Sequence, residues 1–425
     1  MLDLVLLLVQ IVVILGVARG IGWVFKWFHQ QLVIGEMVAG IVLGPSLLGW
    51  VAPGIFANLF PPSSLDFLNA LSQIGLMVFM FLAGLELSPG LVRKLGRPAV
   101  LVSAWGIVFP FILGTLLAVY LYPKLSSAAV PGNQFVLFIG VSMSITAFPI
   151  LARILTEGGL LDSPVGAVAM AAAAADDVSA WIILAGIILL VRAGEATLPL
   201  WLIIVGFLAY VLFMFSIGKR CLRRFVRDNQ SSSISQAQFV IILLLVLVSG
   251  LITGLLQTHT LIGAFLLGVV MPKESWFVLQ LRGKVEDFVV VLLVPLYFAV
   301  TGLRTNLGLM LSPSALFYFG LILFFAVVGK FGGAFCASKM NGMSWRESGT
   351  VGVLMNTRGM IELVALNIGL DIGVISPLLF SALVLMAIIT TFMTTPIVEY
   401  LYPRSYYENL TDRISGNSKT ETAPI

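Results

Sequence analysis

The stretch AAAAADDVSAW, residues 171–181, decides what class of protein this is. It lies inside an apolar segment, 164–192, that is long enough to cross a bilayer, because a spanning helix needs about 20 residues. A charged side chain at the middle of such a helix costs roughly 2.5–3.5 kcal/mol on insertion scales. Adjacent helical residues point about 100° apart, so one partner cannot easily neutralise both Asp176 and Asp177. The pair therefore predicts an intramembrane ion or proton site.

The composition of the whole chain agrees with a membrane protein. Of its 425 residues, 59% are hydrophobic and 10% are charged, and the mean hydropathy is +1.07. A soluble domain carries about 25% charged residues and a disordered chain has low hydrophobicity, so both classes are excluded. The segments are apolar on all sides, which predicts an all-α polytopic protein in the lipid bilayer. The net charge of +4 does not indicate nucleic acid, because the basic residues lie in loops.

About thirteen apolar segments are predicted to form transmembrane helices. Length and hydropathy place them at 3–26, 33–50, 67–87, 97–121, 134–157, 164–192, 198–219, 236–256, 259–272, 286–303, 314–338, 348–370 and 376–402. Eighteen basic residues fall in, or at the segment ends next to, loops after odd-numbered segments, and three in or next to loops after even-numbered ones. The positive-inside rule then puts the N-terminus outside and the C-terminus in the cytoplasm. A plasma or inner membrane is the expected location.

The two halves of the chain resemble each other weakly. IG followed by GIV at 34–42 recurs as IG followed by GVV at 262–270, and two further matches keep the same order: GL at 84–85 with 302–303, and GVSM at 140–143 with GVLM at 352–355. The matched segments lie seven places apart in the order of helices. Because seven is an odd number, the two halves are expected to be inverted in the membrane. The predicted organisation is a first six-helix repeat at 1–192, a linker helix and basic loop at 193–235, a second repeat at 236–403 and a short cytoplasmic tail at 404–425. Inverted repeats are typical of secondary transporters, whose site lies near mid-membrane.

Further charged positions lie inside apolar segments. Lys330 is a candidate counter-ion for one aspartate, although a lysine near a helix end could instead reach toward the interface. Glu36 lies in a glycine-rich segment and could pair with Arg19 or Arg358.

Segments 134–157 and 348–370 are both predicted to break near their middle. A proline cannot donate to the helix ladder and clashes with the preceding turn, and an arginine at that depth needs partners. Broken helices expose carbonyls and half-helix dipoles, which together with a threonine hydroxyl suit a hard cation such as Na⁺. The threonine is Thr146, an expected ligand of the ion. The supporting residues are Ser144 and Pro149 in the first break, and Asn356, Thr357, Arg358 and Glu362 in the second.

These residues resemble the monovalent cation–proton antiporter family, specifically its second subfamily. The matching stretches are SITAFPILARIL at 144–155, DDVSAW at 176–181, Lys330, and MNTRGMIELVALNIG at 355–369. The resemblance implies that Asp177 binds the transported cation or proton and that Lys330 pairs with Asp176 when no cation is bound. It implies that Thr146 belongs to an unwound part of the segment 134–157. It also implies that the discontinuous helices 134–157 and 348–370 cross at mid-membrane, that a core bundle moves against a dimerisation domain, and that the protein is a homodimer.

The expected function is electrogenic exchange of Na⁺, or Li⁺, for H⁺ at a metal site formed by Asp177, Asp176 and Thr146, with no cofactor. K⁺/H⁺ exchange stays open, because the stretch at 144–155 also resembles relatives that carry K⁺. A sodium-coupled symporter and a cation channel are less favoured, since the chain shows no carbonyl-filter motif and two acids at one site favour exchange. An intramembrane aspartyl protease needs facing acids from different helices, so no enzyme is expected.

Overall fold

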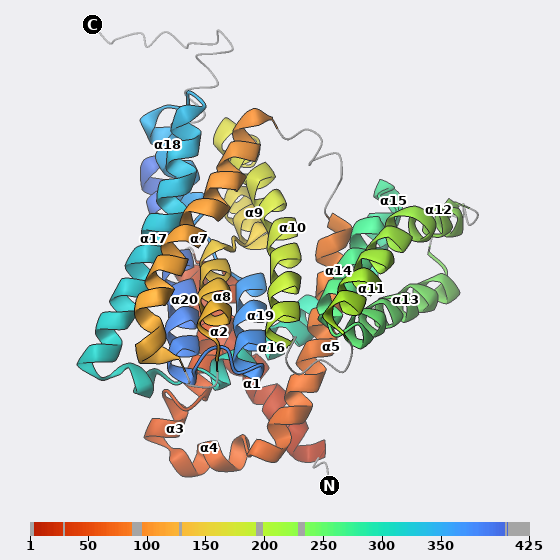
Figure 1. The fold of residues 1–425 in the computed structure, drawn as a ribbon. Coiled ribbons are helices and arrows are strands. Elements are labelled where there is room, and N and C mark those ends of the chain that lie inside the picture. The colour runs from red at the N-terminus through yellow and green to blue at the C-terminus, as the bar shows by residue number, and fades with distance from the viewer. Residues whose placement is uncertain are drawn as a thin grey trace, which may run out of the picture.

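The computed structural model describes residues 4–28, 30–86, 96–126, 130–192, 199–227, 234–403 and 406. Within these ranges every regular element is helical and no strand occurs. The helices α9 (Phe148–Glu157) and α18 (Trp345–Leu354) lie toward one end of the molecule, which we call the upper face, and the first turns of α1 (Leu4–Trp27) lie toward the opposite end (Figure 1). The expected tail at 404–425 lies outside the described residues apart from Tyr406.

The helices pack as two bodies. The first is formed by two stretches that are far apart in the sequence, 4–86 and 200–303. Its helices are α1 (Leu4–Trp27), α2 (Leu32–Leu43), α3 (Leu48–Val51), α4 (Pro53–Leu59), α5 (Pro62–Glu86), α11 (Leu200–Phe213), η1 (Met214–Gly218), α12 (Lys219–Arg227), α13 (Gln236–Leu255), α14 (Thr260–Val270), α15 (Ser275–Phe288), η2 (Val289–Leu293) and α16 (Val294–Leu303). In this body α14 packs along α5, and α16 packs along α2.

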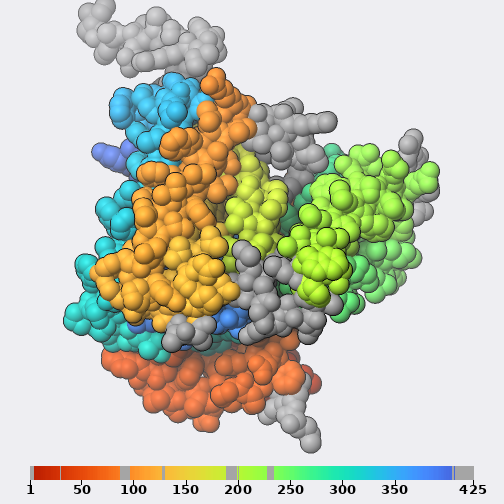
Figure 2. Space-filling view, in the orientation of Figure 1, coloured from red at the N-terminus to blue at the C-terminus, as the bar shows by residue number. Residues whose placement is uncertain are grey.

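The second body holds the conspicuous polar segments. Its helices are α7 (Arg97–Leu125), α8 (Gly132–Ser144), α9 (Phe148–Glu157), α10 (Pro164–Arg192), α17 (Pro313–Met340), α18 (Trp345–Leu354), α19 (Met360–Asp371) and α20 (Pro377–Leu401), and η3 (Leu307–Met310) leads into it. Here α7 packs against both α17 and α8, and α10 packs against α7, α8, α9 and α18. Figure 2 shows α11–α13 in green set apart from the orange second-body helices, with the yellow surface of α10 between them.

Glycines set the closest helix contacts in the first body. A Cβ atom on Gly84 of α5 would lie 2.3 Å from the Phe265 carbonyl oxygen, and one on Gly268 of α14 would lie 2.2 Å from the Phe81 carbonyl oxygen. A Cβ on Gly302 of α16 would likewise lie 2.3 Å from the backbone of Gly40 in α2. Small residues permit this close backbone approach in membrane proteins. The segments that the repeat hypothesis matches, 34–42 with 262–270 and 84–85 with 302–303, thus make corresponding contacts.

Eleven helices of the described chain are long and apolar enough to cross a membrane. The two remaining expected segments are the shorter apolar helix Thr260–Val270 and the broken α18–α19. The segment expected to begin at 67 begins at Pro62, and the one expected at 33–50 is interrupted after Leu43. Two further predicted boundaries were wrong by a wider margin. The segment expected to end at 219 continues through the basic α12, and the one expected to begin at 286 begins at Ser275. In both cases charged residues extend a helix beyond its apolar stretch, where the sequence pattern predicts a loop.

Candidate functional site

The site lies where two broken helices meet inside the second body. Residues 145–147 interrupt α8 and α9, and residues 355–359 interrupt α18 and α19. The two unwound segments touch, because the Ala147 N–H donates to the Thr357 carbonyl over 3.0 Å. Pro149 lies in the first turn of α9, where a proline has no intrahelical hydrogen bond to lose. Four half-helix ends therefore converge within the protein.

Arg358 hydrogen-bonds the carbonyls at the C-terminal end of α8. Its guanidinium donates to the carbonyls of Ser142 and Met143 over 3.1 and 3.0 Å, and also to Glu362 Oε1 over 2.9 Å. The side chains of Arg358 and Glu362 are fully buried. A cation at a helix C-terminus and an anion in the first turn of a helix both interact favourably with the helix dipole. This ion pair belongs to the second broken helix and stabilises the break in the first.

Asp176 has a full set of partners. Its Oδ1 accepts from Ser103 over 2.7 Å, and its Oδ2 accepts from Thr146 over 2.7 Å and from Lys330 Nζ over 3.0 Å. Lys330 also donates to the Gly106 carbonyl over 2.8 Å, and its side chain has no solvent exposure. The attraction within a buried ion pair offsets the cost of burying both charges only when further hydrogen bonds support it, and here Ser103, Thr146 and the Gly106 carbonyl supply them.

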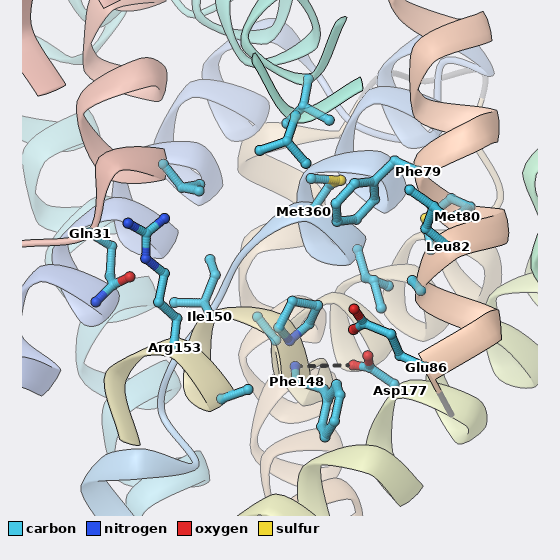
Figure 3. A pocket seen from close by; sticks show the side chains of 18 of the residues that line it. Gln31, Phe79, Met80, Leu82, Glu86, Phe148, Ile150, Arg153, Asp177 and Met360 are labelled. Atoms are coloured by element: carbon cyan, nitrogen blue, oxygen red, sulfur yellow. Dashed lines mark hydrogen bonds between the residues drawn. The ribbon is translucent and has the colours of Figure 1, made fainter. Parts of the chain in front are cut away.

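Asp177 has different surroundings although it is the next residue. Its Oδ1 accepts one long hydrogen bond, 3.4 Å, from the Phe148 N–H at the start of α9. Its carboxylate lines a cavity of about 550 Å³, and Figure 3 shows the Asp177 and Glu86 side chains within it. The cavity lies between the two bodies, since residues of both line it, and two of its lining residues, Arg282 and Glu86, form an ion pair over 3.0 Å. Of the two adjacent aspartates, Asp177 is therefore the one that faces this cavity.

The structure brings the predicted residues together, with one difference. Thr146 bonds Asp176 and makes no described contact with Asp177, so the expected grouping of Thr146 with Asp177 around one ion requires this hydrogen bond to rearrange. Ser144 donates to the carbonyls of Ile107 and Gly140 over 3.1 and 2.8 Å, and Thr357 donates to the Leu354 carbonyl over 2.8 Å. Asn356 lies in the second break with its buried Oδ1 unbonded among the described residues.

Sequence reasoning missed one residue of the site and misjudged another. Ser103 bonds Asp176, but a single serine in an apolar helix carries no signal that separates it from many others. The pairing suggested between Glu36 and Arg358 was wrong, because Arg358 bonds Glu362. Arg19 also makes no ion pair with Glu36 and instead donates to the Val291 carbonyl over 3.3 Å.

A helical membrane protein in which two broken helices cross beside buried carboxylates has the architecture of an ion-coupled secondary transporter. Comparison with known families gives the particular class. Residues 11–400 match the family described as sodium/hydrogen exchanger, transmembrane. The chain belongs to this family, whose members are transporters rather than enzymes.

Individual relatives support the assignment. The chain is 40% identical to the Na(+)/H(+) antiporter NhaS4 of Synechocystis, over 94% of this chain and 98% of that protein. It is 32% identical to K(+)/H(+) antiporter 1 of Saccharomyces cerevisiae, over 99% of this chain and 49% of that one, so it spans about half of the yeast protein. The solved sodium proton antiporter MjNhaP1 of Methanocaldococcus jannaschii shares the fold, with a TM-score of 0.65 at 12% identity, over 96% of this chain and 99% of that chain.

Proposed function

We propose that this protein is a secondary active antiporter that exchanges Na⁺, or Li⁺, for H⁺ at Asp177. The observation that carries the proposal is the contrast between the two acids. Asp176 is held by Lys330, Ser103 and Thr146, whereas Asp177 faces the cavity with a single backbone donor. A carboxylate with free acceptor positions can bind a cation or a proton, but not both at once. Competition for Asp177 then couples the two flows.

Oxygen atoms around Asp177 suit a hard cation. The break at 145–147 frees carbonyls from helical hydrogen bonding, and the Thr146 hydroxyl keeps a lone pair after donating to Asp176. Na⁺ prefers oxygen ligands of this kind, as do other hard cations. The site residues we propose for the ion are Asp177, Asp176 and Thr146, with Lys330 as the counter-ion and Ser144, Pro149, Asn356, Thr357, Arg358 and Glu362 in support.

The Lys330–Asp176 pair supports an electrogenic exchange. A cation that attracts the Asp176 carboxylate weakens its bond to Lys330, and an uncompensated buried lysine readily loses its proton. Asp177 and Lys330 together would then release two protons for one Na⁺. One net charge would cross the membrane in each cycle, so the membrane potential would drive transport.

Alternating access requires the cavity to close on one side and open on the other. We propose that the second body carries Asp177 between the two sides, while the first body stays in place and forms a homodimer interface. The upper face is then cytoplasmic, with the N-terminus outside. The division of the chain into two inverted six-helix repeats around the linker helix at 193–235 is part of this proposal, and the matched glycine contacts support it.

The test is exchange by purified protein in liposomes with a clamped membrane voltage. Asp177→Asn should abolish Na⁺-dependent proton movement, because an amide cannot hold either ion as a carboxylate does. Asp176→Asn should retain exchange but lose most of the current, since Lys330 would no longer be tied to a charged partner. Full exchange by Asp177→Asn would refute the site, and a normal current from Asp176→Asn would refute the electrogenic scheme.

K⁺/H⁺ exchange is the second candidate. The relationship to the yeast K(+)/H(+) antiporter supports it, as does the stretch at 144–155. The same liposomes separate the two functions when Na⁺, Li⁺ and K⁺ are supplied one at a time over a range of pH. Exchange that saturates with K⁺ and not with Na⁺ would replace the first proposal.

A further inference from the structure

The cavity that reaches Asp177 has a second carboxylate without a cationic partner. Four acids line the cavity: Glu36, Glu86, Asp177 and Glu286. Arg282 forms ion pairs with both Glu86 and Glu286, so neither of these is free to neutralise an incoming ion. Among the described residues, no hydrogen bond or ion pair reaches the Glu36 carboxylate. Glu36 therefore resembles Asp177 in being open to the cavity.

Glu36 is held in place by its helix. It is 3% exposed, in α2, which packs against α16 so closely that a Cβ on Gly40 would lie 2.7 Å from the Ala299 carbonyl oxygen. Asp177 belongs to α10 in the second body, whereas α2 belongs to the first. The two unpaired acids thus face one cavity from opposite bodies.

The charges nearest Glu36 have other partners. The cations whose field reaches it are Arg19 of α1 and Arg153 of α9. Arg19 donates to the Val291 carbonyl over 3.3 Å, and Arg153 forms an ion pair with Glu157 over 2.9 Å. The other charged groups around the cavity, Glu86, Arg282 and Glu286, bond one another. Nothing in the described part of the chain compensates Glu36 at contact distance.

An isolated carboxylate in a water-poor site is costly unless an ion or proton accompanies it. Much of the cavity wall is apolar, with Phe79, Phe298 and Met360 among the lining side chains. A cation that loses water on its way to Asp177 finds few oxygens there to replace it. Glu36 supplies such an oxygen pair inside the cavity.

We infer that Glu36 is a second monovalent-cation site, from which the ion passes to Asp177 on the opposite body. This inference rests on the proposed exchange function and adds a loading step to it. A loading site raises the local concentration of the cation and is not itself part of the exchange at Asp177. Loss of the Glu36 site should therefore weaken the apparent affinity for the cation more than it lowers the maximal rate of exchange.

The kinetic test compares Glu36→Gln, Glu36→Asp and Glu399→Gln in liposomes. Glu399 is the matched control, since it is an exposed acid near the end of α20 and does not line this cavity. Glu36→Gln should raise the Na⁺ concentration for half-maximal exchange about tenfold while the maximal rate changes less than about twofold, the pattern of lost uniform binding. Glu36→Asp should recover most of the affinity, and Glu399→Gln should match the unmodified protein.

A binding measurement separates this inference from the function proposed above. Radioactive Na⁺ binding to purified Asp177→Asn protein should show a weak residual site that disappears in the Asp177→Asn, Glu36→Gln double variant. Normal exchange by Asp177→Asn would overturn the proposed function itself. If Asp177→Asn is inactive but Glu36→Gln leaves affinity and residual binding unchanged, the Glu36 site alone is refuted. Complete loss of exchange by a monodisperse Glu36→Gln protein would also refute it, because a loading site is dispensable at high Na⁺.

Discussion

Asp176 and Asp177 are adjacent in α10, yet their carboxylates meet different partners. Asp176 accepts from Ser103, Thr146 and Lys330, and Asp177 accepts only from a backbone N–H among the described residues. Because adjacent helical residues point about 100° apart, one side chain faces α7 and α17 and the other faces the cavity. The division of labour between two identical side chains is therefore a result of helix geometry.

Ser103 is predicted to hold the Asp176 carboxylate in position. Ser103→Ala removes a 2.7 Å hydrogen bond and leaves Oδ1 without its partner in a buried site. We expect a loss of about 1–3 kcal/mol, the usual cost of an unsatisfied buried group, measured as a lower melting temperature in detergent. Ser179→Ala is the control in α10, because the Ser179 hydroxyl donates only to the Ala175 carbonyl of its own helix. Equal melting temperatures for the two variants would contradict the assigned role.

At the scale of elements, Lys273 joins the ends of two helices. Its Nζ donates to the carbonyls of Gly84, Leu85 and Gly268 over 2.7–2.8 Å, where α5 and α14 cross. Carbonyls at a helix C-terminus lack intrahelical partners, and a lysine can satisfy them. Burial lowers the pKa of Lys273 to about 7, against the opposing effect of Glu86 and with a smaller contribution from Lys219. The crossing therefore contains a group that titrates near neutral pH.

The stability of the protein should depend on pH through Lys273. Its usual pKa is 10.5, so between about pH 7 and 10.5 the unfolded chain keeps a proton that the folded protein has lost. The unfolded state binds more protons in this window, and the free energy of unfolding therefore rises with pH. Melting curves in detergent should show this rise in the unmodified protein and a smaller rise in Lys273→Met. Lys284→Met is the control on α15, and a curve for Lys273→Met parallel to the unmodified one would contradict the prediction.

At the scale of the whole molecule, the cavity lies between two bodies whose contacts are sparse. The Gln31 side chain, in the first body, donates to Glu157 at the end of α9 over 2.8 Å. Packing within each body is far closer, as the glycine contacts between α5 and α14 in the first body and between Gly333 of α17 and the Trp105 carbonyl of α7 in the second show. Rigid-body displacement of one body against the other is an established way to open a site alternately.

Cross-linking the two bodies should stop exchange. We expect Gln31→Cys with Glu157→Cys, in a protein in which Cys221 and Cys336 are replaced by serine, to lose most of its activity with a short cleavable thiol cross-linker and to regain it on cleavage. The control is Tyr210→Cys with Ser249→Cys, a pair within the first body whose hydroxyls lie 2.6 Å apart. Undiminished exchange by the first cross-linked pair, measured in liposomes, would mean that the bodies do not move at this contact.

The fold class followed from the sequence, because apolar length and charge distribution report directly on a membrane environment. The acids Asp176 and Asp177, the lysine Lys330 and the breaks near Thr146 and Thr357 were also visible, since polar groups in apolar segments are rare and costly. Helix ends were less certain where charged residues extend a helix beyond the membrane, as in α12.

Tertiary structure decided which groups meet. Ser103 is an ordinary residue in its segment, whereas Glu36 stands out as a charge in an apolar segment. Only packing brings Ser103 to Asp176 and leaves Glu36 facing the cavity of Asp177. Likewise, Arg358 bonds the carbonyls at the end of α8 because the two breaks cross, whereas its ion pair with Glu362 is local to its own segment. Local sequence reports the cost of placing a charge in the membrane, whereas the partner that offsets this cost comes from residues far away in the chain.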